Sequence, residues 1–86
     1  MSTALAIQLP TAPIAQIADL VRRDWKNISP CAVPYLRAMS KLSSIEDVYF
    51  ADDGRSIVLY FLANASGWRG ETARLVKAEL KRRVGV

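Results

Sequence analysis

The last third of the chain constrains the fold most strongly. An apolar run over residues 56–65 leads through Trp68 into a basic amphipathic segment, residues 70–84. The run shows no polar alternation, and its apolar residues recur with the helical period of 3.6: Ile57, Phe61, Leu62 and Ala65. This pattern favours a helix over a strand. We therefore predict two helices, 53–65 and 70–84, with the first apolar on most of its sides and buried.

Two further helices are predicted upstream, over residues 13–27 and 33–42. The first has an apolar stripe at helical spacing, formed by Ile14, Ile17, Ala18, Val21 and Trp25. It must end before Pro30, because the residue preceding a proline avoids the α conformation. We therefore expect an all-α fold: a single small domain of about four helices over residues 13–86, preceded by a flexible N-terminal arm over residues 1–12.

The segment from Val48 to Tyr60 also fits another structure. Asp-Gly between β-branched and aromatic residues is a strong hairpin signal. The alternative to the all-α fold is therefore an α+β fold with a hairpin around Asp52-Asp53-Gly54. Just upstream, the segment Ser43–Glu46 matches a capping box, which predicts a short helical turn through Val48.

The composition excludes most catalytic and metal chemistry. The chain contains no histidine, which removes Ser-His-Asp and Cys-His nucleophile arrangements and most zinc sites. Its single cysteine, Cys31, lacks a second thiol and is interpreted as a small buried apolar residue. The glycines lie too far apart for a phosphate-binding loop. We expect a protein that is not an enzyme, with no cofactor and no metal site.

The same composition suggests a cytoplasmic protein. The N-terminal residues lack the basic region of a secretory signal, and no run approaches the ~20 apolar residues of a membrane span. One cysteine allows no internal disulfide, which fits a reducing compartment. We therefore expect no membrane partner.

Charge is segregated along the chain, whose net charge is +4. Residues 44–54 contain four acidic residues and no basic one, which we interpret mainly as helix caps: Glu46, Asp47, Asp52 and Asp53. The last helix is basic, and Arg74, Lys77 and Lys81 fall on one side of it. The candidate residues for binding a partner or nucleic acid are Arg69, Arg74, Lys77, Lys81 and Arg82. The alternative interpretation of the basic residues is an ordinary solvated helix face. Trp68 is interpreted as a buried core residue rather than as an exposed binding residue.

Several short strings are similar to known sequences. They are Val33-Pro34-Tyr35-Leu36, Ala38-Met39, Tyr60-Phe61-Leu62, Asn64-Ala65, Trp68-Arg69-Gly70-Glu71, Ala73-Arg74, Lys77 and Glu79-Leu80. Together they resemble a group of small uncharacterised proteins encoded by bacterial phages, plasmids and other mobile elements. The resemblance covers roughly residues 13–83. It implies a bacterial or phage setting, a cytoplasmic location and a non-enzymatic accessory role.

Two functional hypotheses follow. The first is an accessory protein of a phage or mobile element that acts by binding another protein, such as a component of a host defence or replication system. The second is a DNA- or RNA-binding accessory protein that uses the basic C-terminal helix together with Arg22, Arg23 and Lys26. A homodimer is a further alternative, because half of the residues are hydrophobic and an apolar stripe could be buried between two copies.

Overall fold

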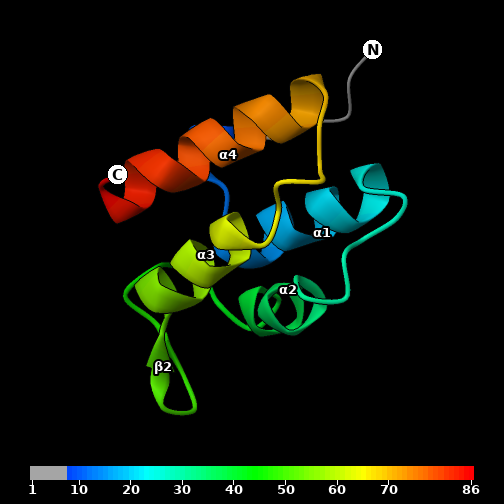
Figure 1. Cartoon of the computed structure of the whole chain (residues 1–86). Helices are drawn as coiled ribbons and strands as arrows, with labels where there is room; N and C mark the ends of the chain where they lie inside the picture. The colour runs from blue at the N-terminus through cyan, green and yellow to red at the C-terminus, as the bar shows by residue number, and fades with distance from the viewer. Residues whose placement is uncertain (1–7) are drawn as a thin grey trace.

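The computed structural model describes residues 8–86, which form a predominantly helical domain with one small antiparallel hairpin (Figure 1). In chain order the elements are η2 (Leu9–Thr11, a 3-10 helix), α1 (Ile14–Asp24), α2 (Val33–Met39), β1 (Val48–Tyr49), β2 (Asp52–Asp53), α3 (Gly54–Ala63) and α4 (Glu71–Val84). The predicted helical class is confirmed. The segment that permitted either a helix or a hairpin contains both, one directly after the other.

The hairpin turn lies upstream of the position that the Asp-Gly signal suggested. Val48 pairs with Asp53 and Tyr49 with Asp52, so the turn residues are Phe50 and Ala51. Asp53 instead ends the hairpin and caps α3, because its Oδ1 accepts a hydrogen bond from the backbone N–H of Ser56 at 2.7 Å. The Asp-Gly pair therefore starts a helix rather than turning a hairpin.

Three aromatic side chains form the centre of the core. Trp25 and Trp68 are stacked, with ring centroids 5.9 Å apart and planes 15° apart, and Phe61 meets both rings edge-on at 6.5 Å. The indole N–H of Trp68 donates to Oδ2 of Asp24 at 2.8 Å, so the one polar atom of the ring has a partner. Burial of Trp68 in the core is thus the correct interpretation.

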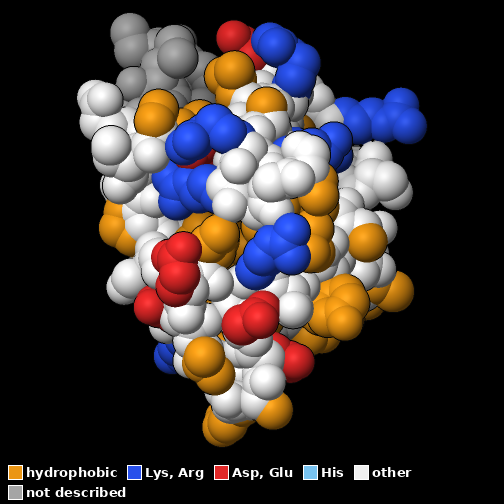
Figure 2. All heavy atoms as spheres, turned by 90° about the vertical axis from the view of Figure 1, so that its left-hand side faces the viewer, with side chains coloured by type: hydrophobic (Ala, Val, Ile, Leu, Met, Phe, Trp, Pro, Cys, Tyr) orange, Lys and Arg blue, Asp and Glu red, His pale blue; other side chains and the backbone are white. Residues whose placement is uncertain are grey.

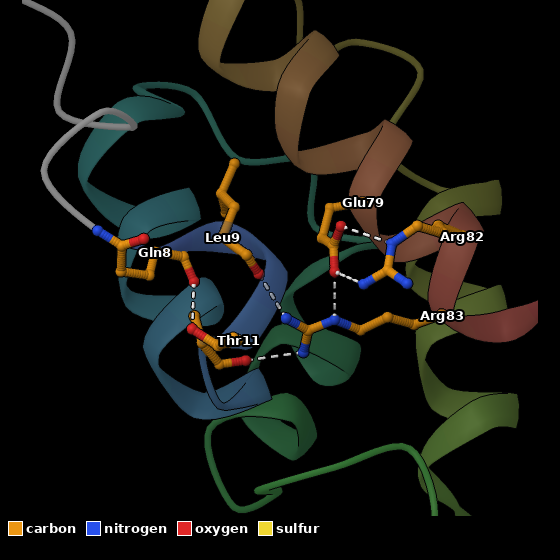
Figure 3. A network of polar contacts seen from close by, with 7 residues as sticks. Gln8, Leu9, Thr11, Glu79, Arg82 and Arg83 are labelled. Atoms are coloured by element: carbon orange, nitrogen blue, oxygen red, sulfur yellow. Dashed lines mark hydrogen bonds and ion pairs between the residues drawn. The ribbon is translucent and has the colours of Figure 1, made fainter.

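The chain before α1 is attached to the end of α4. Arg83 donates from Nη1 to the carbonyl oxygen of Ala12 at 2.7 Å and from Nη2 to that of Leu9, while Glu79 binds its Nε at 2.7 Å (Figure 3). Residues 1–7 of the predicted arm lie outside the described residues. Residues 9–12 are packed against α4, with Ala12 buried, and belong to the domain.

Two local predictions were wrong. No capping box forms at Ser43–Glu46, because it is the carboxylate of Asp47 that accepts hydrogen bonds from the N–H groups of Ser43 at 2.7 Å and Ser44 at 3.2 Å. This segment is a turn without a helix. Cys31 is exposed rather than buried, because the neighbouring Ala32 occupies the core position at the start of α2.

Gly54 is required where this turn packs onto α3. The N–H of Gly54 donates to the carbonyl of Asp47 at 2.7 Å, and that of Arg55 to the carbonyl of Ile45 at 3.0 Å. A Cβ atom at residue 54 would lie 2.8 Å from the carbonyl oxygen of Ser44 and 2.9 Å from Cα of Ile45. Both neighbours are backbone atoms, so neither can rotate away, and only glycine fits.

We predict that Gly54→Ala lowers the free energy of unfolding by about 1–3 kcal/mol, because the added methyl group overpacks a backbone contact. Gly67→Ala is the matched control, since a Cβ there meets nothing within 4 Å. Urea denaturation of both variants checks the prediction. Equal stability of the two variants would show that the 44–47 turn moves away from α3 without loss.

Candidate functional site

Basic side chains gather toward one end of the molecule, and acidic and exposed apolar side chains gather toward the other (Figure 2). In Figure 1 the hairpin projects below α3, on the side away from α4. On the face shown in Figure 2, most Lys and Arg side chains lie in the upper half, and most Asp and Glu side chains lie in the lower half near an apolar tip. The chain therefore presents two different candidate surfaces, one basic and one apolar with an acidic margin.

The basic surface is formed at the junction of Trp68 with α4. Arg69, Arg74 and Lys77 line a shallow hollow of about 290 Å³ beside the edge of Trp68. Lys81 follows Lys77 one turn further along α4. Within residues 8–86, no acidic side chain forms an ion pair with Arg69, Arg74 or Lys81. These three cations are therefore free to meet an anionic ligand.

Lys77 has a structural role in addition to its charge. Its Nζ donates to the carbonyl oxygen of Trp68 at 2.6 Å and lies 6.0 Å from the centroid of the indole ring. Partial burial lowers the pKa of Lys77, and the nearby charges of Lys81 and Arg69 lower it further. The Lys77 ammonium thus holds the turn before α4 in place while it repels its basic neighbours.

Arg82 belongs to a different cluster (Figure 3). Its Nε and Nη2 donate to the two carboxylate oxygens of Glu79 at 3.0 and 2.6 Å, a bidentate pair. These hydrogen bonds lower the pKa of Glu79 and raise that of Arg82. Of the five predicted binding residues, Arg69, Arg74, Lys77 and Lys81 therefore adjoin one surface. The charge of Arg82 is offset by Glu79.

The apolar surface lies at the hairpin and was not among the predicted site residues. Phe50 at the hairpin turn is 87% exposed, Val48 is 67% exposed, and Tyr60 on the outer side of α3 is 52% exposed. We call these three residues and the groove beside them the hairpin surface. Isolated exposed apolar residues are ordinary, whereas a group of them beside a groove is typical of an interaction site.

The groove of the hairpin surface has a volume of about 260 Å³. Residues from α2, the hairpin and α3 line it: Pro34, Tyr35, Ala38, Tyr49, Phe50, Asp52, Ile57 and Tyr60. Two aromatic pairs stand within this lining. Tyr35 and Tyr60 have ring centroids 5.5 Å apart, and Tyr49 and Phe50 have centroids 4.6 Å apart. The lining contains one acidic residue, Asp52, and no basic residue.

The four acidic residues of segment 44–54 divide into two roles. Asp47 and Asp53 accept backbone hydrogen bonds, from Ser43 and Ser44 and from Ser56 respectively, and these bonds lower the pKa of both carboxyls. Glu46 and Asp52 are exposed, and neither forms an ion pair within the described part of the chain. They give the margin of the hairpin surface its negative charge.

The described residues contain neither a candidate metal cluster nor a helix that could cross a membrane. No group of three or more Cys, Asp or Glu side chains within residues 8–86 could hold a metal ion. None of the helices described there is both long enough and apolar enough to cross a membrane.

Comparisons with known proteins add no relative. No family model matches the chain, and no curated protein or solved structure matches it significantly.

Stability should decrease in acid because three carboxyls have lowered pKa values in the folded chain: Asp47, Asp53 and Glu79. A carboxylate whose pKa is lower in the folded than in the unfolded state stabilises the fold above its unfolded value. That contribution is lost as the pH falls through the folded value. Stability should therefore be full at neutral pH and decline from the ordinary values of 3.8 and 4.5 downward.

We predict that Glu79→Gln lowers stability at neutral pH and makes its decline below about pH 4.5 less steep. Urea denaturation at a series of pH values measures both effects. Glu71→Gln is the control, because Glu71 is exposed and forms no ion pair within residues 8–86. Parallel pH profiles for Glu79→Gln and the unaltered chain would contradict the stabilising role of the Arg82–Glu79–Arg83 cluster.

Proposed function

We propose that this chain is a non-enzymatic accessory protein of a bacterial phage or other mobile element, and that it acts by binding another protein through the hairpin surface. The partner class that fits such a setting is a component of a host defence or replication system. The observation that supports the proposal most directly is Phe50, a large apolar side chain held in solvent on a left-handed backbone.

The backbone conformation of Phe50 makes its exposure informative. Its φ angle is 58°, in the left-handed region where a bulky residue is a rare outlier. That conformation costs roughly 1–2 kcal/mol for a residue other than glycine. Asparagine or glycine would avoid most of this cost, and Phe50 contributes nothing to the buried core. Strained residues of this kind cluster at functional sites, which supports a binding role for Phe50.

The surroundings of Phe50 have the composition of a protein-binding site. Aromatic residues are enriched among the residues that contribute most to binding energy, and such residues cluster beside pockets. Phe50 and Tyr60 are both exposed and both line the groove. A partner that covered the hairpin surface would remove from water three of the four large apolar side chains that are exposed within residues 8–86, the fourth being Val86.

We predict that Phe50→Ala weakens capture of the protein partner by at least about 30-fold, the effect of losing about 2 kcal/mol at a binding hot spot. The measurement is affinity capture from a bacterial host, followed by titration of the captured protein. Lys81→Ala is the matched control on the basic surface, and it should change capture by less than about threefold.

A stability control accompanies this experiment. Phe50→Asn should leave the free energy of unfolding unchanged or raise it by up to about 1 kcal/mol, because asparagine tolerates a left-handed backbone. The same variant should lose the partner. Equal capture by Phe50→Ala and the unaltered chain, with Lys81→Ala defective, would reject binding through the hairpin surface.

A second candidate function is binding of DNA or RNA through the basic surface. Its support is that Arg69 and Arg74 line one hollow, that Lys81 follows Lys77 one turn further along α4, and that none of these three cations has an acidic partner in the described chain. Cations without an acidic partner can neutralise phosphates, and this releases the counterions bound to the nucleic acid. The prediction of this alternative is binding to duplex DNA that weakens steeply with salt.

Replacing Arg69, Arg74 and Lys81 together by Glu tests the alternative. If all three contact phosphates, the slope of log binding constant against log salt concentration should become less steep by about 3. Arg37→Glu and Lys41→Glu, at exposed residues on and just after α2, serve as controls of equal charge type. No binding at about 50 mM salt would reject this function.

A further inference from the structure

We infer that the groove of the hairpin surface receives a lysine or arginine side chain presented by the protein partner, an inference that rests on the proposed function. The groove brings together aromatic rings and a carboxylate without a cation of its own. This combination is the chemistry by which proteins recognise cationic groups.

The aromatic walls come from separate elements. Tyr35 on α2 and Tyr60 on α3 form one ring pair, and Tyr49 with Phe50 at the hairpin forms the other. All four rings line the same groove. The face of an aromatic ring is negative, so a cation within about 6 Å of a ring centroid is attracted to it. Because rings from three elements line one groove, one cation can lie near more than one of them.

Asp52 supplies the formal negative charge. It lines the groove, it is exposed, and it forms no ion pair within residues 8–86. Its main-chain groups take part in the pairing with Tyr49, so the hairpin holds its position. Asp52 therefore differs from its neighbour Asp53, whose carboxylate already accepts a hydrogen bond from α3.

The charge of the residues that line the groove favours a positively charged occupant. No basic residue lines the groove, and none occurs in segment 44–54, although the whole chain has a net charge of +4. Asp52 would repel an anionic occupant and would give an uncharged donor a hydrogen bond alone, whereas a cation gains from both the carboxylate and the rings.

The volume of the groove selects the size of the occupant. About 260 Å³ accommodates one long side chain but not the body of a helix. Lysine and arginine have long apolar stems that can lie against the tyrosine rings while the charged end meets Asp52. The partner's backbone would then lie across the exposed side chains of Val48 and Phe50.

The test uses two small probes of similar shape, tetramethylammonium and the uncharged tert-butanol, titrated into the full chain. NMR chemical shifts of the ring protons of Tyr35, Tyr49 and Tyr60 report occupancy of the groove. We expect tetramethylammonium to shift these signals in a saturable manner and to bind at least about threefold more tightly than tert-butanol.

Two variants identify the contribution of the carboxylate. Asp52→Asn should weaken binding of tetramethylammonium by about threefold or more, because it removes the charge while it keeps the shape. Asp19→Asn, at an exposed carboxylate on α1, should leave it unchanged. Equal binding of the two probes, no saturable shift of the ring protons, or equal effects of the two variants would each overturn the inference.

These results separate the inference from the proposed function. If Phe50→Ala abolishes capture of a protein while tetramethylammonium does not bind, the hairpin surface binds its partner without a cation and only the inference fails. If tetramethylammonium binds through Asp52 but Phe50→Ala leaves capture intact, the groove recognises cations and the proposed function fails. Capture of a second copy of this chain alone would overturn both.

Discussion

The arrangement of the helices depends on the contacts made by the buried indole ring of Trp68. Its ring stacks on Trp25 at the end of α1, meets Phe61 of α3, and donates its N–H to Asp24. Its own carbonyl oxygen accepts a hydrogen bond from Lys77 of α4. One residue in a loop therefore joins three helices, and this explains how a loop of seven residues between α3 and α4 can hold a single conformation.

Helices α1 and α4 could be predicted from the sequence because each has a clear local signal. The apolar stripe of α1 and the dipole-matched charges of α4 depend only on spacing. The failures were of another kind. The backbone contact of Gly54 with the 44–47 turn, and the attachment of residues 9–12 by Arg83, join segments distant in the sequence. No periodicity encodes such contacts. The capping box failed for a local reason, because the carboxylate of Asp47 accepts the hydrogen bonds of Ser43 and Ser44.

The candidate sites show the same division. Arg74, Lys77 and Lys81 could be placed on one side of a helix from spacing alone, and they do share a surface. Whether a cation is free or paired depends on its neighbours in the folded chain. The sequence alone does not show whether the guanidinium of Arg82 pairs with Glu79 or is solvated by water. The hairpin surface was missed because Val48, Tyr49 and Phe50 resemble core residues in any composition-based analysis. In the folded chain Val48 and Phe50 are exposed, whereas Tyr49 is half-buried against the core.

The left-handed backbone at Phe50 has a consequence for the entropy of association. A loop that orders only when a partner arrives loses conformational freedom at that moment, and the loss weakens binding. At Phe50 the hydrogen-bonded pairing on either side of the turn and the contact with Tyr49 restrict the ring before any encounter. The cost of ordering this side chain is met during folding by the stability of the helical core. A molecule that docks on the hairpin meets an aromatic ring on a backbone that is already ordered.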